Sequence, residues 1–111
     1  MPTDQVREAL AGLSEYDRRA LVAIVHITDT YRWGGATPAS IGHEVWGPRD
    51  RQEDRRRKAQ GYGRLGGRFA RRLMDAELVN RRFRYRGDSG VIVPTWLGRQ
   101  VAMELANAEE V

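Results

Sequence analysis

The chain has no cysteine among its 111 residues. This absence excludes disulfide bonds, thiolate zinc sites and cysteine nucleophiles together. The sequence also has no run of about 18 apolar residues, so we expect no segment that spans a membrane. Residues 1–10, MPTDQVREAL, lack the basic and apolar regions of a secretion signal. We therefore expect a cytoplasmic protein.

Side chains that could carry catalysis or bind a metal are few. His26 lies within an apolar run, which predicts a core or boundary position rather than a ligand. His43 is followed by Glu44, but position 47 is glycine, so the zinc-binding pattern H-E-x-x-H is absent. The three serines lie where helices or turns are expected to begin: Ser14, Ser40 and Ser89. We therefore expect no enzymatic activity, no metal and no cofactor.

Arginine is abundant, in contrast, and it is concentrated in one part of the chain. Eighteen of the nineteen basic residues are arginine, the net charge is +4 and the pI is about 10.1. A high arginine content alone can follow from a GC-rich genome, but its placement cannot. Residues 51–86 hold thirteen basic and four acidic residues, a net +9, which leaves −5 for the rest. Because arginine suits contacts with phosphate and guanine, this segment predicts a nucleic-acid footprint.

The length and the 41% apolar fraction predict one globular domain over residues 1–111. We expect an N-terminal helix within 1–13, a core unit over 14–93 and a C-terminal helix over 95–108. Residues 49–60, RDRQEDRRRKAQ, are almost wholly polar. They fit either a solvent-exposed connector or a loop that becomes ordered on binding.

Capping residues mark the first helices. A short helix is expected over 4–11, and Ser14 opens a longer one with Asp17 three residues later, as in a capping box. Its apolar residues repeat at three- and four-residue intervals: Ala20, Leu21, Ile24, Ile27 and Tyr31. Thr37 and Pro38 suit the cap and the first position of the next helix, which we expect to end before Gly47.

Residues 61–73, GYGRLGGRFARRL, fit two patterns. The first six match G-x-G-x-x-G, but that phosphate loop needs a buried strand before it, and the preceding segment is charged. The stretch instead predicts a basic amphipathic helix over 62–76, because apolar and charged residues separate at about 100° per residue. The apolar face holds Leu65, Phe69, Leu73 and Ala76, and the opposite face holds Arg64, Arg68, Arg71 and Asp75, with Arg72 on the flank.

The glycines of this helix are unusual, because each costs about 0.5–1 kcal/mol relative to alanine. We expect Gly63, Gly66 and Gly67 to let the start of the helix approach either DNA or a neighbouring helix closely, with the order of the helix completed on binding.

A β-hairpin and a last helix are expected next. Residues 78–86 alternate with period two, with Val79, Arg81, Phe83 and Tyr85 on one side and Asn80, Arg82, Arg84 and Arg86 on the other. Residues 87–90 form a turn, and 91–93 return as the second strand. Thr95 caps the last helix, whose apolar side is expected to include Trp96, Leu97, Val101 and Leu105.

This order of elements resembles the winged helix-turn-helix proteins, in particular small bacterial regulators of the MarR and PadR kind. Residues 64–79, RLGGRFARRLMDAELV, look like the recognition helix and its exit into the wing, and 93–99, VPTWLGR, look like the end of the wing and the next helix. The likeness covers residues 14–105. It departs at 47–61, where fifteen residues replace the usual short turn.

The resemblance implies a mainly α fold with a β-hairpin wing, and a homodimer that binds double-stranded DNA as a transcriptional repressor in the cytoplasm. It implies that helix 62–76 enters the major groove and that the 79–93 wing meets the DNA backbone or minor groove. The residues expected to contact DNA are Thr37, Ser40, Arg55, Arg56, Arg57, Lys58, Tyr62, Arg64, Gly67, Arg68, Arg71, Arg72, Arg82, Arg84 and Arg86.

Two other functions stay open. The chain fits an accessory DNA-binding factor in phage or plasmid maintenance or recombination, and it fits a winged-helix module that docks an acidic protein. The sequence indicates no pocket for a small-molecule effector, because Trp33 and Trp46 are expected in the core.

Overall fold

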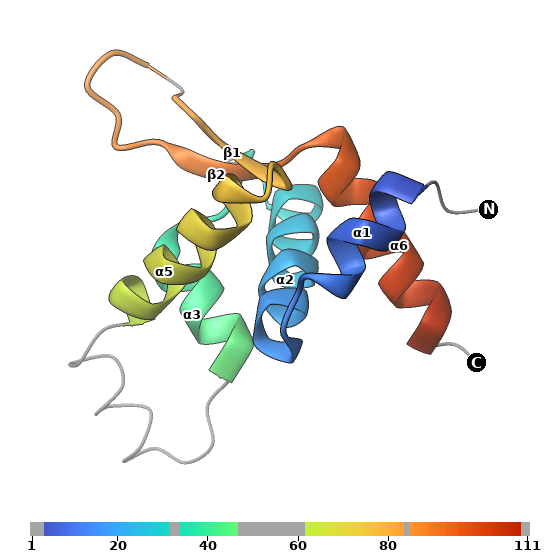
Figure 1. The fold of residues 1–111 in the computed structure, drawn as a ribbon. Helices are drawn as coiled ribbons and strands as arrows, with labels where there is room; N and C mark the ends of the chain where they lie inside the picture. Colours follow the sequence, from blue (N-terminus) through green and yellow to red (C-terminus); the bar gives the residue numbers. More distant parts are fainter. Residues whose placement is uncertain (1–3, 32–33, 47–61, 84, 110–111) are drawn as a thin grey trace.

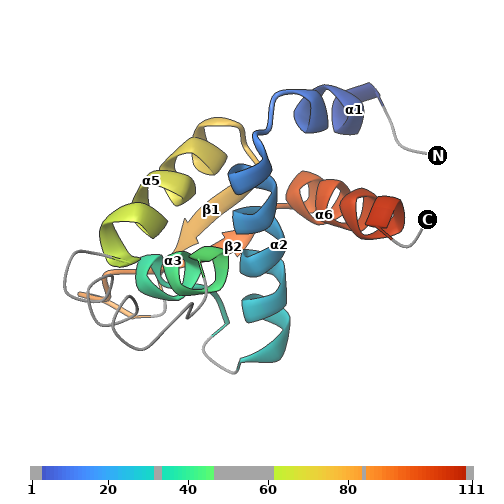
Figure 2. The same cartoon turned by 90° about the horizontal axis from the view of Figure 1, so that it is seen from below.

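The computed structural model describes residues 4–31, 34–46, 62–83 and 85–109. These residues form five helices and one two-stranded antiparallel hairpin, so the fold is mainly helical with a small β element (Figure 1). In chain order the elements are α1 (Asp4–Ala11), α2 (Glu15–Thr30), α3 (Pro38–Trp46), α5 (Tyr62–Asp75), β1 (Val79–Arg82), β2 (Val91–Pro94) and α6 (Trp96–Glu109). Helix α2 is central, with α3 and α5 on one side and α1 and α6 on the other (Figure 2).

Helix α2 begins where the sequence predicts. The Ser14 hydroxyl accepts a hydrogen bond from the backbone N–H of Asp17 at 3.2 Å, which makes Ser14 the N-cap. Four residues of the predicted apolar repeat are buried: Ala20, Leu21, Ile24 and Ile27. Burying each Leu or Ile stabilises the fold by about 1.5–3 kcal/mol. Tyr31 departs from the prediction because the helix ends at Thr30, and Tyr31 is exposed.

Helix α3 begins with a reciprocal cap, as predicted. Thr37 Oγ1 accepts from the Ser40 N–H at 3.1 Å, and Ser40 Oγ accepts from the Thr37 N–H at 2.9 Å. Pro38 occupies the first helical position, where its fixed φ and missing N–H cost nothing. Ile41 and Val45 are buried on the inner side of the helix.

Helix α5 packs against α3 at very close range because Gly66 has no side chain. A Cβ at Gly66 would overlap the carbonyl oxygen of Pro38 and would lie 3.0 Å from the backbone nitrogen of Gly42. Phe69 and Leu73 are buried on the same side of α5. The predicted helix and its apolar face are thus confirmed, except that α5 ends at Asp75, so that Ala76 lies outside it and is exposed.

A tight turn joins α5 to β1. The Leu78 N–H donates to the Leu73 carbonyl and the Glu77 N–H to the Met74 carbonyl, both at 2.9 Å, which are the two bonds of a Schellman motif. Glu77 has a φ of 63°, in the left-handed region where glycine is usual and where a Cβ costs about 1 kcal/mol. The fully buried Leu73 and Leu78 side chains supply the apolar contact that accompanies this motif.

The hairpin is anchored to the core at its base. Val79 pairs with Pro94 and Arg82 with Val91 across the two strands. Ala36, just before α3, adds an isolated antiparallel bridge to Ile92 through two hydrogen bonds of 2.7 Å. Because Val79, Val91 and Ile92 are buried, the base of the hairpin is part of the core.

The predicted first strand, 78–86, is too long at its outer end. Strand β1 ends at Arg82, and Phe83 is exposed although it shares the strand period with buried Val79. Among the described residues beyond Arg82, where the hairpin extends past the helices (Figure 1), Phe83, Tyr85 and Arg86 are exposed, so none of the three packs into the core. Residues 87–90 begin and end with glycines of positive φ, as the predicted turn requires.

Helix α6 is fixed to the α5–β1 turn. Thr95 Oγ1 accepts from the Gly98 N–H at 3.0 Å and donates to the Glu77 carbonyl at 2.8 Å, so it caps α6 as predicted. Gly98 also permits a close approach, because a Cβ there would overlap the carbonyl oxygen of Leu78.

The prediction that Trp96 lies on the apolar side of the last helix is wrong. The residue is 68% exposed, whereas Val101 and Ala102 are buried and Leu97 and Leu105 are half-buried. At about 100° per residue, Trp96 lies roughly 140° from Val101 around the helix, which puts it on the opposite face.

Candidate nucleic-acid interface

One face of α5 is exposed and cationic. Arg64, Arg68 and Arg71 are exposed, while Phe69 and Leu73 on the other side are buried. None of these three arginines forms an ion pair with another described residue. Like charges three or four residues apart on a helix repel by a few tenths of a kcal/mol per pair. A polyanion bound along this face would remove that repulsion.

The glycines of α5 have different surroundings. A Cβ at Gly66 meets the backbone of α3, whereas a Cβ at Gly63 or Gly67 meets no atom within 4 Å. The close approach to a neighbouring helix that was expected of Gly63, Gly66 and Gly67 is therefore found at Gly66 alone among the three. Gly66 permits the approach of the neighbouring helix, and Gly67 leaves open space beside the backbone that precedes Arg68.

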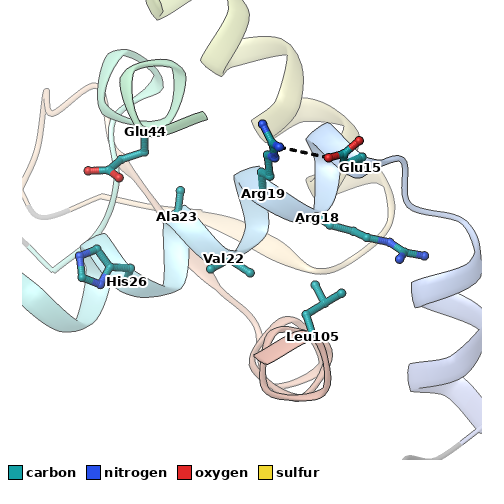
Figure 3. Close-up of a pocket in the computed structure, with 8 residues that line it drawn as sticks. All are labelled: Glu15, Arg18, Arg19, Val22, Ala23, His26, Glu44 and Leu105. Atoms are coloured by element: carbon teal, nitrogen blue, oxygen red, sulfur yellow. Dashed lines mark hydrogen bonds and ion pairs between the residues drawn. The ribbon is translucent and has the colours of Figure 1, made fainter. Parts of the chain in front are cut away.

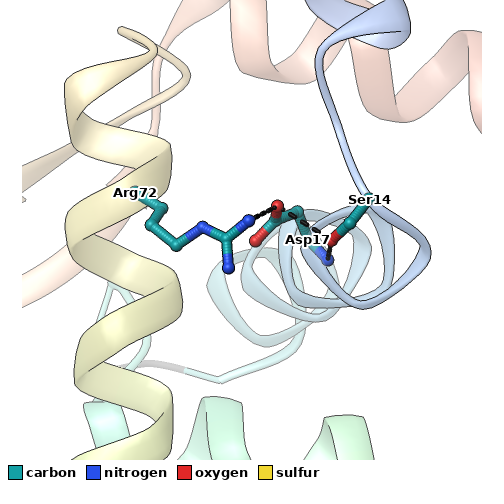
Figure 4. A network of polar contacts seen from close by, with 3 residues as sticks. All are labelled: Ser14, Asp17 and Arg72. Carbon is teal, nitrogen blue, oxygen red and sulfur yellow. Dashed lines mark hydrogen bonds and ion pairs between the residues drawn. The ribbon is translucent and has the colours of Figure 1, made fainter.

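A buried carboxylate holds Arg72 against α2 (Figure 4). Asp17 Oδ2 accepts from Arg72 Nη2 at 2.7 Å and from Ser14 Oγ at 2.9 Å. The Asp17 side chain is 4% exposed and that of Arg72 is 61% exposed. The pair therefore connects α5 to α2, and it favours a positioning role for Arg72. The DNA contact expected of this residue stays a prediction.

Sequence reasoning gives Asp17 a capping role and misses its burial. The signal for the burial lies in its position, because Asp17, Leu21 and Ile24 repeat at intervals of four and three residues. The carboxylate thus shares the buried face of α2, where a charge requires a partner.

The hairpin adds further exposed cations. Arg82 and Arg86, which were expected to contact DNA, are exposed, and Arg84 lies outside the described residues. Arg81 is exposed as well, although the period-two pattern placed it with Val79. Sequence reasoning missed Arg81 because only the first residue of β1 is covered by the core.

Thr37 and Ser40 lie near the N-terminal half of α5, since Pro38 between them packs against Gly66. Their hydroxyls serve the cap of α3, and Ser40 Oγ also donates to the Thr37 carbonyl at 2.9 Å. Their contact with phosphate stays a prediction. The other predicted positions lie outside the residues and side chains that the structure describes: Arg55, Arg56, Arg57, Lys58, Trp33 and the side chains of Tyr62 and Trp46.

A hollow of about 620 Å³ lies between α2, α3 and α6 (Figure 3). It is lined by side chains of both charges, and Arg19 pairs with Glu15 at 3.1 Å at its edge. His26 also lines it and is exposed, so the expected core or boundary position is wrong. The helical period explains this, because His26 shares the outer face of α2 with Glu15 and Val22.

Among the described residues, no group of three or more His, Cys, Asp or Glu could hold a metal ion. Of the helices described, none is long and apolar enough to cross a membrane.

Comparison with known protein families, curated proteins and solved structures gives no match. A functional assignment therefore depends on the geometry of this chain. Its most distinctive feature is the arginine face of α5, held in place by Gly66 and by the Asp17–Arg72 pair.

Proposed function

We propose that this protein binds double-stranded DNA in a sequence-specific manner and regulates transcription. In this proposal the fold is a winged helix-turn-helix, α5 enters the major groove, and the β1–β2 hairpin is the wing. The observation that carries the proposal is the exposed triplet Arg64, Arg68 and Arg71 on one face of α5. Their guanidinium groups suit bidentate contacts with guanine and phosphate.

The order of the elements supports this architecture. Helix α2 is followed by the Ala36 bridge, then by α3, α5 and the hairpin, and Ala36 pairs with Ile92 of the hairpin. Recognition helices of this class lie in the major groove while a preceding helix crosses the backbone. In this proposal, α3, whose N-terminus lies beside α5, is that preceding helix.

The distribution of charge supports DNA over an acidic protein as the partner. Three arginines at intervals of four and three residues follow one side of a helix, and a helix of about 10–12 Å diameter fits the major groove. Arg81, Arg82 and Arg86 extend the cationic surface along the hairpin.

The first test measures the affinity of the protein for duplex DNA as a function of salt concentration. If about six phosphates are neutralised, log affinity should fall against log salt with a slope near −5. Arg68→Ala is expected to weaken binding to the preferred sequence about tenfold and to relax sequence preference. Arg19→Ala on α2, whose guanidinium pairs with Glu15, is the charge-matched control. A flat salt response, or equal losses in the two variants, would contradict the proposal.

The proposed DNA-binding form is a homodimer. Helices α1 and α6 lie on the side of α2 opposite α5, and Trp96, Met103 and Val22 expose apolar side chains on α6 and α2. A two-fold interface there would leave both copies of α5 free for half-sites about one helical turn apart.

Sedimentation velocity tests the dimer. The wild type is expected to sediment as a dimer at tens of micromolar, and Met103→Glu is expected to shift it to monomer, because a buried charge at the interface is costly. A wild type that stays monomeric at that concentration would exclude this part of the proposal.

A further inference from the structure

Two aromatic side chains at the outer part of the hairpin are largely exposed. Phe83 is 62% and Tyr85 66% exposed, although large aromatic side chains usually bury most of their area. Neither contributes to the core, which ends at the base of the hairpin with Val79, Val91 and Ile92. Such exposure in a two-stranded hairpin suggests an external surface for these rings.

The ring of Phe83 is supported on one side by backbone. A Cβ at Gly90 would lie 3.2 Å from Phe83 Cε1 and 2.7 Å from Arg81 Cγ. Gly90 has a φ of +90°, so the turn needs a glycine there in any case. The missing side chain leaves room for the Phe83 ring and the Arg81 stem to lie over the returning strand. The rest of the ring faces outward.

The charge around Phe83 limits what this surface can bind. Residues 79–91 contain four arginines and one aspartate, and the described ones, Arg81, Arg82 and Arg86, are exposed. An apolar ring among guanidinium groups matches a ligand that offers flat apolar surfaces between phosphates. The base steps of a nucleic acid have this chemistry.

The hairpin lies on the same side of the molecule as α5. In both views, α5 and the hairpin extend away from α6, and only the turn at Ala76–Leu78 separates α5 from β1 along the chain (Figures 1 and 2). A duplex that contacts both surfaces would run from α5 toward the hairpin.

We propose that Phe83 is a wedge that enters a base step of the bound duplex from the minor groove, unstacks it and bends the DNA. This inference rests on the proposed DNA binding by α5. Arg81, Arg82 and Arg86 would neutralise the phosphates on either side of the opened step. Apolar side chains inserted in this way kink a duplex toward the major groove by about 20–90°.

The experiment compares three probes of about 25 nucleotides: a fully paired duplex, the same duplex with a short central mismatch, and one single strand. A mismatch lowers the energy needed for unstacking, so the wild type should bind the mismatched duplex about tenfold more tightly than the paired one. Phe83→Ala should bind both duplexes equally, and Phe83→Leu should keep part of the preference.

Tyr16→Ala is the matched control, because it removes another exposed aromatic ring, on α2 and outside the hairpin, and should keep the preference. Energy transfer between dyes at the two ends of the paired duplex should increase with the wild type and not with Phe83→Ala. Thermal unfolding of each variant confirms that the fold is intact.

The outcomes separate the two proposals. Binding to none of the probes would refute DNA binding itself. Equal binding of the wild type to both duplexes without bending, or a preference that survives in Phe83→Ala, would overturn the wedge and leave DNA binding standing. Preference for the single strand over both duplexes would also overturn it, because the ring would then stack on separated bases.

Discussion

Alanine at Gly66 is expected to destabilise the protein by about 3 kcal/mol, whereas alanine at the next residue, Gly67, is expected to stabilise it by up to about 1 kcal/mol. At Gly66 the new Cβ would overlap the Pro38 carbonyl oxygen, and backbone cannot rotate away as a flexible side chain does. Helices α3 and α5 would have to separate, which would loosen the contacts of Phe69 and Leu73. At Gly67 nothing lies within 4 Å, so only the better helix propensity of alanine remains.

Thermal denaturation followed by circular dichroism measures both effects. For a chain of this size a change of 1 kcal/mol corresponds to about 4 °C in Tm, so the two variants should differ by roughly 15 °C. Each variant is the other's control, because both make the same chemical change one residue apart. Similar Tm values for both would mean that α5 does not approach α3 as described.

The same pair bears on the DNA proposal. If Gly67 lets a phosphate approach the backbone of α5, Gly67→Ala should be more stable yet bind duplex DNA less well. Tighter binding by this variant would mean that Gly67 does not provide space for a phosphate at the DNA interface. A double Gly66, Gly67 variant would mix two opposite effects, so the single variants are the informative ones.

Arg72→Ala is expected to cost about 2 kcal/mol of folding free energy, whereas Arg71→Ala should change it by less than about 0.5 kcal/mol. Removing Arg72 leaves the Asp17 carboxylate buried without its cation. The cost of breaking a fully buried pair is about 3–5 kcal/mol, and the exposure of Arg72 reduces it here. Arg71 is exposed and pairs with no described residue.

A double-mutant cycle isolates the pair. Asp17→Ala, Arg72→Ala and the double variant should show a coupling of about 1–2 kcal/mol in urea denaturation. In DNA binding the order should reverse, with Arg71→Ala weakening the complex more than Arg72→Ala at a temperature where both are folded. Equal destabilisation by the Arg71 and Arg72 variants would refute the distinction between a contact residue and a positioning residue.

The parts of the fold that the sequence predicts are those set by neighbours in the chain. Ser14, Thr37 and Thr95 each cap a helix through atoms three residues away, so a short pattern identifies them. The faces of α5 follow from its helical period, because an amphipathic helix in a small domain buries its apolar side.

Features set by distant parts of the chain could not be predicted in this way. Asp17 and Arg72 are 55 residues apart, and nothing near either one indicates the pairing. Gly66 and Gly67 are identical in sequence terms, and only the position of α3 distinguishes them. For Phe83 and Trp96, an apolar side chain predicts a core contact, but the core does not extend to the outer hairpin or to that side of α6.

Glu77 makes the joint between α5 and the hairpin stiff. A residue with a Cβ has a narrow left-handed basin where glycine has a broad one, so few backbone angles are available to Glu77 at its φ of 63°. The Leu78 N–H bond to Leu73 and the Thr95 hydroxyl bond to the Glu77 carbonyl restrain the joint further. The angle between the arginine face and the hairpin is therefore set before any ligand binds. In the proposed complex, which engages both surfaces, the DNA would therefore be the partner that has to change shape.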